Sequence, residues 1–284
     1  MTRKDKIYNC FKKCILHIAE LKYPLIRKRK YSLQYYLDNF LLLLNDMVTW
    51  KSLKYTYDYH NNNNKFHWKS IYNEYNRWAK DNIFEDAYIH FMNNNYFKLS
   101  NVRKNRKLNL FIDVTKINNK YGSEYIGINN EYKKKNVTAL TVICDDNKLP
   151  LAVSYMAINK NKTKAGNNTI RHDIKGVQPT LNNIPINLKK YIKINLIGDK
   201  GYITQKKYKV FNRKVKMTCP KRKNQKTKNT KTEKIMLKDR HKIENLFASI
   251  KNYNRISLRR DKHIKNYMSF VYVGLMKYIS NKLK

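Results

Sequence analysis

Three apolar runs in the middle of the chain constrain its fold more than any other feature. They cover residues 108–114, 137–143 and 151–158, they are rich in β-branched and aromatic residues, and polar turns separate them. Such runs are typical of β-strands. The connection over 145–150 is short, which favours antiparallel pairing of the two strands that it joins. We therefore expect a three-stranded antiparallel meander.

After this meander the pattern predicts helices alternating with strands. A helix is predicted over about 169–182, a strand over 192–197 and a shorter strand over 215–219. Three strands followed by helix, strand, helix and strand is the order of an α/β domain with a mixed sheet. The last part of the chain, 235–251 and 263–283, is again predicted to be helical.

The first hundred residues are predicted to be helical. Apolar residues recur at three- and four-residue intervals over 31–50 and 69–92, and the Asn run at 61–64 marks a loop between these stretches. The second stretch breaks near Asp81 and Asn82, which predicts two helices joined by a tight turn. Its apolar stripe comprises Phe66, Trp68, Ile71, Tyr75, Trp78, Phe84, Tyr88 and Phe91. Both a helix-turn-helix unit and an ordinary helical bundle cap fit this pattern.

The charge of the chain indicates its partner. There are 61 Lys and Arg residues against 20 Asp and Glu, a formal net charge of +41. Such an excess causes self-repulsion, which a polyanion offsets. Because 42% of the residues are hydrophobic, a folded body must carry the charge, and nucleic acid is the leading ligand. Codon bias in an AT-rich genome explains the Asn runs and the 23 Tyr residues, but not three basic residues for each acid.

One segment concentrates the positive charge. Between Pro220 and Lys234 there are seven Lys or Arg residues and one Glu, without apolar periodicity. We expect an exposed basic loop that contacts DNA, the alternative being a loop that is merely solvated. Basic runs at 27–30 and 220–223 resemble nuclear-import signals, but they carry little weight in a chain this basic.

The sequence gives no sign of membrane insertion or secretion. The apolar run at 40–44 is far shorter than the roughly 20 residues of a spanning helix, and the chain opens with charge. We expect an intracellular protein, cytoplasmic in a prokaryote or nuclear in a eukaryotic or viral setting. Four scattered cysteines do not favour a disulfide framework. A zinc site from Cys10, Cys14 and His17 is disfavoured because no fourth ligand lies nearby in the sequence.

Two aspartates occupy unusual places in the predicted sheet. Asp113 lies inside an apolar strand, where a carboxylate is costly unless it is paired or binds a metal. Asp199 follows another strand at a turn between two glycines, where ligands of α/β sheets gather. Taken singly, each is explained equally well as a turn or helix-capping residue.

A predicted helix carries a third carboxylate between basic residues. Arg240, Glu244 and Lys251 are separated by steps of four and seven residues, which return all three to nearly the same face. A Glu beside the apolar stripe of such a helix can face a cleft while the neighbouring cations hold an anion. The simpler alternative is an Arg–Glu surface pair, worth roughly a few tenths of a kcal/mol. The adjoining apolar stripe consists of Met236, Ile243, Phe247 and Ile250.

Occurring together and in this order, these segments resemble the DDE transposases of insertion sequences, specifically the insertion-sequence four/five superfamily with its ribonuclease-H-like catalytic domain. Phe-Ile-Asp-Val-Thr at 111–115 resembles the block around the first Asp of the family. Gly-Asp-Lys-Gly-Tyr at 198–202 resembles the second block. Arg240-x3-Glu244-x6-Lys251 resembles the third block, with both spacings intact.

Further segments extend the resemblance to about residues 30–284. Residues 77–84 resemble the segment that precedes the catalytic domain in these proteins. His172-Asp173 falls where relatives carry an H-D or N-D pair, as a helix-start or accessory site residue. Leu237 stands where the family signature has Tyr, which makes the branch without that Tyr the closer relative.

The resemblance implies an enzyme that cuts and joins DNA at the ends of a mobile element. Its catalytic residues would be Asp113, Asp199 and Glu244, and these would hold two Mg²⁺ or Mn²⁺ ions, because oxygen-only ligands select such metals. The chain would then consist of a helical DNA-binding region over 1–100 and a ribonuclease-H-like catalytic domain over 101–284.

The same resemblance implies the remaining contacts and partners. Arg240, Lys251 and Lys200 would contact DNA phosphates. The partners would be double-stranded DNA, at the element ends and at the target, and further copies of the chain in a dimer or larger synaptic complex. Two alternatives remain open: a non-catalytic DNA-binding protein descended from a transposase, and a nuclease with the same fold.

Overall fold

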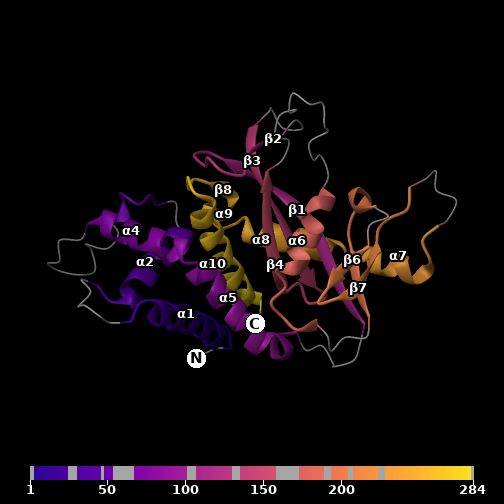
Figure 1. Ribbon diagram of the computed structural model, residues 1–284, viewed down its shortest axis with the longest axis horizontal. Coiled ribbons are helices and arrows are strands. Elements are labelled where there is room, and N and C mark those ends of the chain that lie inside the picture. The colour runs from indigo at the N-terminus through magenta and orange to yellow at the C-terminus, as the bar shows by residue number, and fades with distance from the viewer. Residues whose placement is uncertain are drawn as a thin grey trace. The chain divides into compact units, whose positions relative to one another are not determined.

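The computed structural model describes residues 3–24, 31–45, 48–53, 67–100, 107–129, 135–157, 173–188, 193–203, 207–222 and 228–282. The chain divides into two compact units, one formed by Met1–Phe91 together with Ile250–Lys284, and the other by Met92–Ser249. Figure 1 labels the helices and strands of both. No helix in the described ranges is both long and apolar enough to cross a bilayer.

The first unit is helical. The turn predicted at Asp81 and Asn82 is confirmed, since one helix ends at Lys80, the next begins at Ile83, and Asn82 has a φ of 57°. The Asn run at 61–64 lies outside the described residues. The elements are α1 (Arg3–Lys22), α2 (Leu33–Asn45), α4 (Trp68–Lys80), the first part of α5 (Ile83–Leu99), α9 (Asn254–Ser257), the two-residue strand β8 (Leu258–Arg259) and α10 (Ile264–Lys282).

Aromatic residues from α2, α4, α5 and α10 form the core of this unit. The ring of Phe40 lies 5.1 Å from Tyr75 and 5.3 Å from Trp78, and Tyr75 stacks on Phe270 at 4.7 Å. The fully buried hydroxyl of Tyr75 donates a hydrogen bond of 2.6 Å to the carbonyl of Asn266. Aromatic residues on the stripe predicted for α4 and α5 therefore hold the C-terminal helix.

The second unit contains a mixed sheet. Its strand order is β2-β3-β1-β5-β7-β6, and β4 also pairs with β3. Its elements, after the end of α5, are β1 (Leu108–Asn119), β2 (Gly127–Asn129), β3 (Lys135–Asp145), β4 (Pro150–Ala157), the 3-10 helix η1 (Asp173–Gly176), α6 (Val177–Asn182), β5 (Ile194–Ile197), the 3-10 helix η3 (Lys200–Tyr202), β6 (Tyr208–Val210), β7 (Arg213–Thr218), α7 (Lys231–Lys238) and α8 (His241–Ile250).

The pairing of the strands confirms the predicted fold class. β1, β3 and β4 form the expected antiparallel meander. β5 then pairs parallel to β1, and β7 parallel to β5, so the sheet is mixed. An antiparallel meander continued by parallel strands and flanked by helices is the arrangement of a ribonuclease-H-like domain. The short strands β2 and β6 were not predicted from the sequence.

One face of this sheet is covered by α6. Thr180 of α6 lies with its hydroxyl oxygen 2.6 Å from that of Ser154 on β4. Ser154 pairs in register with Thr141, and Thr141 pairs with Val114. Because in-register partners share a face, α6 covers the face to which Val114 belongs.

The opposite face is covered by α7 and α8. Asn109 and Phe111 alternate with Val114 along β1 and so belong to this second face. Lys242 of α8 has its ammonium 5.3 Å from the ring centroid of Phe111. Glu233 of α7 forms a 2.9 Å ion pair with Lys216 of β7.

Two predictions for the later part of the chain need correction. The single helix expected over 235–251 is two helices, because the chain turns at Asp239 and Arg240 between α7 and α8. The basic segment expected to be a loop up to Lys234 becomes helical at 231. The physical reason is a capping box, in which Thr230 and Glu233 satisfy each other's backbone N–H groups. Residues 223–227 lie outside the described part.

The start of the helix predicted over 169–182 also differs. Its described part begins at Asp173 with the 3-10 turn η1 and continues as α6. Residues 169–172 lie outside the described ranges.

Gly176 allows this helix to approach the sheet. A Cβ at this position would overlap the Oγ1 of Thr141 and the Cε of Met156. We therefore expect Gly176→Ala to destabilise the protein by about 1–3 kcal/mol through overpacking. The measurement is the urea midpoint of unfolding. Lys175→Ala, at the exposed neighbouring position, is the matched control and should leave the midpoint nearly unchanged; equal midpoints for both variants would contradict the close approach.

Candidate active site

Two of the predicted site residues follow the paired residues of two parallel strands. Phe111 of β1 pairs in register with Ile197 of β5. Asp113 follows Phe111 by two residues within β1, and Asp199 follows Ile197 by two residues, just beyond the end of β5. Neighbouring strands lie about 4.8 Å apart, and in-register residues share a face. The two carboxylates therefore belong to one face at one end of the sheet.

Local contacts fix both carboxylates. Asp113 Oδ1 accepts a 2.8 Å hydrogen bond from the backbone N–H of Val114, and its side chain is half-buried. Asp199 caps the 3-10 helix η3, and its Oδ1 accepts a 2.7 Å hydrogen bond from the N–H of Gly201. For Asp199, the sequence left helix capping and a site role as alternatives. The structure shows the capping contact, and the same carboxylate is the candidate site group.

Glu244 lies on α8, over the face of the sheet that carries these two aspartates. Its side chain is half exposed and forms a 2.9 Å ion pair with Arg240. The predicted i,i+4 contact is therefore present, although Arg240 precedes the first residue of α8 instead of lying within it. Lys242 beside Phe111 shows that α8 packs on the Asp113 face.

The structure does not gather all three acids around one point. Within the described ranges, no three His, Cys, Asp or Glu side chains lie close enough to hold a metal ion together. Asp113 and Asp199 supply carboxylate oxygens at adjacent positions, a donor set that suits Mg²⁺ or Mn²⁺. Glu244 could join this donor set only after its ion pair with Arg240 is broken.

The remaining predicted contacts occupy different places. Lys200 follows Asp199 directly and is exposed. Lys251 follows the last residue of α8 and is also exposed. Asp173 begins η1, and His172 lies outside the described residues. Lys200 is thus the chain neighbour of Asp199, whereas Lys251 lies where α8 ends.

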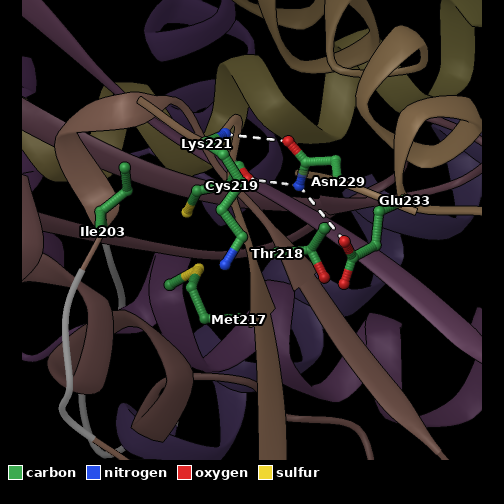
Figure 2. A pocket seen from close by; sticks show the side chains of 7 residues that line it. All are labelled: Ile203, Met217, Thr218, Cys219, Lys221, Asn229 and Glu233. Carbon is green, nitrogen blue, oxygen red and sulfur yellow. Dashed lines mark hydrogen bonds between the residues drawn. The ribbon is translucent and has the colours of Figure 1, made fainter. Parts of the chain in front are cut away.

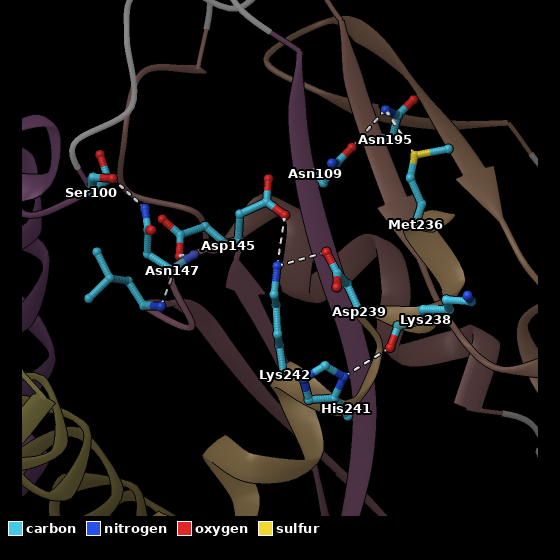
Figure 3. Close-up of polar contacts among 12 residues, drawn as sticks. Ser100, Asn109, Asp145, Asn147, Asn195, Met236, Lys238, Asp239, His241 and Lys242 are labelled. Carbon is cyan, nitrogen blue, oxygen red and sulfur yellow. Dashed lines mark hydrogen bonds and ion pairs between the residues drawn. The ribbon is translucent and has the colours of Figure 1, made fainter. Parts of the chain in front are cut away.

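Sequence reasoning missed a cluster of charges that anchors α8 to the sheet. The ammonium of Lys242 donates to Asp239 at 2.9 Å, as Figure 3 shows. The same ammonium lies 3.5 Å from a carboxylate oxygen of Asp146. Burial raises the pKa of Asp146, and the charge of Lys242 opposes that rise. Burial alone would lower the pKa of Lys242, but the two carboxylates raise it. These groups are ordinary turn and helix-start residues in the sequence, and no sequence signal joined them.

A second feature missed from the sequence is a cavity beside Asp199. Its volume is about 110 Å³. Figure 2 shows its lining side chains, which come from the end of β7, from the chain after η3 and from the start of α7. They are Ile203, Met217, Thr218, Cys219, Lys221, Asn229 and Glu233.

Comparison with known families bears on the same region. The family model described as "Transposase DDE domain" matches residues 171–264. Residues 171–264, about a third of the chain, are thus similar to a transposase DDE domain. The match includes Asp199 and Glu244 but not Asp113, and it does not specify the insertion-sequence four/five superfamily. No curated protein and no solved structure matches the chain significantly.

Within the matched residues, Cys219 reports on the charge of Asp199. The buried thiol has its pKa raised to about 11, first by burial and second by the negative charge of Asp199. Replacing Asp199 by Asn removes the second cause and keeps the first. We therefore expect Asp199→Asn to lower the pKa of Cys219, so that alkylation of this thiol becomes faster at any given pH between 8 and 10.

The measurement is residue-resolved mass spectrometry of alkylation rates against pH, with EDTA present throughout. Cys14 is the internal control, because its pKa is raised to about 12 by burial and by Cys10, without a contribution from Asp199. If the Cys219 rate at fixed pH stays unchanged in the variant, the carboxylate does not lie close to the thiol.

Proposed function

We propose that the protein is a transposase that cuts and joins DNA at the ends of a mobile element, with Asp113, Asp199 and Glu244 as its catalytic and metal-holding residues. The observation that carries this proposal is the parallel register of β1 and β5, which leads Asp113 and Asp199 to the same end of the sheet, in a chain that is similar over residues 171–264 to a transposase DDE domain. One carboxylate at a strand end is common, whereas two at the same end of a sheet repel each other, and a bound cation would offset that repulsion.

The carboxylates would act by holding two Mg²⁺ or Mn²⁺ ions at the strand ends. When bound, such ions activate water or a DNA 3′-hydroxyl and stabilise the leaving oxygen at the phosphodiester. Asp113 and Asp199 would stay in place, because a backbone N–H holds one oxygen of each. Hydrolysis at the element ends would free 3′-hydroxyls, and the same residues would then serve their joining to target DNA.

Arg240 and Glu244 would change partners when DNA binds. Their ion pair is half exposed, so it is weak. A phosphate near the scissile bond would take the guanidinium, which binds two oxygens in a fork. Glu244 would then be available to the ions. Arg240 would thus hold Glu244 before DNA binds, and it would hold the phosphate after DNA binds.

Basic residues outside the carboxylate site would hold the DNA. Lys200 and Lys251 would contact phosphates next to the scissile bond. The segment 220–234 would extend this contact, supported by the exposure of its described basic residues Lys221, Arg222 and Lys228. The helical region over 1–100 would bind the element end, and pairing of two ends would require a dimer or a larger complex.

The first test is cleavage of DNA that carries the flanking ends of the coding sequence. We expect nicking at these ends with Mg²⁺ or Mn²⁺ and none with EDTA. Asp199→Asn and Asp113→Asn should each reduce the rate at least a hundredfold, because each removes one charge from the ion site. Gel analysis of end-labelled DNA gives the rate.

Glu20→Gln is the control for this test, since it changes an exposed acid of α1 and should leave the rate unchanged. Binding of the ends without cleavage under either metal would favour a non-catalytic DNA-binding descendant of a transposase. Cleavage without any joining to target DNA would favour a nuclease with the same fold.

Lys251 offers a separate test of the phosphate contacts. Lys251→Ala should slow end cleavage by about ten- to a hundredfold, the effect of losing one charged contact near the reacting phosphate, while general DNA binding falls much less. Single-turnover rates and filter-binding affinities measure the two effects. Equal losses in rate and affinity would count against a place beside the scissile bond.

A further inference from the structure

We propose that the cavity at the carboxyl end of β7 is a subsite for one phosphate of the DNA strand, next to the phosphate at Asp113 and Asp199. Thr218 and Lys221 would donate hydrogen bonds to its oxygens. The identification of the ligand as DNA rests on the proposed function. The position of the subsite rests on the cavity itself.

The sheet puts this cavity in line with the two aspartates. Thr218 of β7 pairs in register with Ile197 of β5, and Ile197 pairs with Phe111 of β1. All three belong to the face that carries Asp113 and Asp199. Thr218 therefore lies on the strand next to β5, level with Ile197, which precedes Asp199 by two residues. A DNA strand that crosses the ends of these strands would meet both places.

The hydroxyl of Thr218 indicates that something polar binds there. The residue is 3% exposed, and its Oγ1 has no hydrogen-bond partner. A buried polar group without a partner costs free energy, so such groups are rare in folded proteins. Here the group lines a cavity of about 110 Å³, room for more than one water molecule or for a small polar ligand.

The charge around the cavity favours an anion. Lys221 lines it, and Figure 2 shows the ammonium of this exposed residue pointing into it beside Met217. Lys221 is held from behind, because its backbone N–H donates a 2.9 Å hydrogen bond to Asn229. The amide of Asn229 also donates to the carbonyl of Cys219 at 3.1 Å. The rim that carries the ammonium is thus fixed before a ligand arrives.

One carboxylate lines the same cavity, but its charge is already balanced. Glu233 accepts a 2.9 Å hydrogen bond from the ammonium of Lys216 through Oε1. Its Oε2 accepts from the backbone N–H of Thr230 at 3.2 Å and from Asn229 at 3.3 Å. These contacts lower its pKa and keep it ionised within a pair. The ammonium of Lys221 is therefore the uncompensated charge among the lining residues that the structure describes.

Thr218→Val tests the proposal with two readouts of opposite direction. Valine has nearly the same shape and removes a hydroxyl that lacks a partner, so the urea midpoint should stay equal or rise. Affinity for duplex DNA with the element ends should fall about tenfold, because a hydrogen bond to a charged oxygen is lost. A hydroxyl with a purely structural role would give the reverse pattern, a lower midpoint and unchanged affinity, and that result would overturn the proposal.

Lys221→Gln tests the charge. Each phosphate neutralised by the protein contributes about 0.9 to the slope of log affinity against log salt. We expect this variant to reduce the slope by about 1, measured by fluorescence anisotropy in EDTA. Lys175→Gln is the matched control, an exposed lysine of η1 on the side of the sheet covered by α6. An unchanged slope for Lys221→Gln would remove this residue from the DNA contact.

A neutral phosphate analogue locates the contact on the DNA. Ends that carry a single methylphosphonate, moved position by position, should bind the wild-type protein more weakly at one phosphate beside the scissile bond. At that position Lys221→Gln should add no further loss. These binding experiments contain no metal and require no cleavage, so inactive protein that still gives this pattern would refute the proposed catalysis and keep the subsite. Additive losses at every position would refute the subsite alone.

Discussion

The parallel register of β1 and β5 is the constraint on which the candidate site depends. It pairs Phe111 with Ile197 and so leads Asp113 and Asp199, each two residues further along the chain, to the same end of the sheet. A slip of one residue would turn one carboxylate to the opposite face. The buried apolar residues on both sides of Phe111 oppose such a slip, since they would then have to change faces as well. The packing of the core thereby fixes the position of the charges.

The helical layer on this face adapts to the charges beneath it. α7 and α8 are separate helices, and at the turn between them Asp239 pairs with Lys242, three residues further on, while Arg240 pairs with Glu244, four residues further on. The first pair is partly buried, and its Lys242 also lies over the ring of Phe111 and 3.5 Å from Asp146, contacts that hold α8 on the sheet. The second is exposed and weak. Asp239 and Arg240 are neighbours in one turn, yet the first belongs to the partly buried charge cluster and the second forms only a weak pair with Glu244.

The sequence predicted the elements of the fold well, because each rests on local patterns. The meander, the break at Asp81 and Asn82 and the mixed sheet follow from alternating or helical apolar spacing. The split of the helix over 235–251 was missed, because the apolar stripe continues across it and the capping box at Thr230 lies upstream. The cavity around Thr218 was missed for another reason. It depends on which strands pair, and Thr218 lies within an ordinary strand.

The exposed pair of Arg240 and Glu244 explains how a chain with three matching acids can lack a gathered triad. A surface ion pair contributes about 0–1 kcal/mol, and Glu244 is half exposed in it. Without cations, moving Glu244 toward Asp113 and Asp199 would bring three like charges together. That repulsion would add to the loss of the ion pair with Arg240. Without ions, pairing with Arg240 is therefore the lower-energy arrangement. With ions and a phosphate present, each partner has a stronger alternative, so the same two side chains would separate.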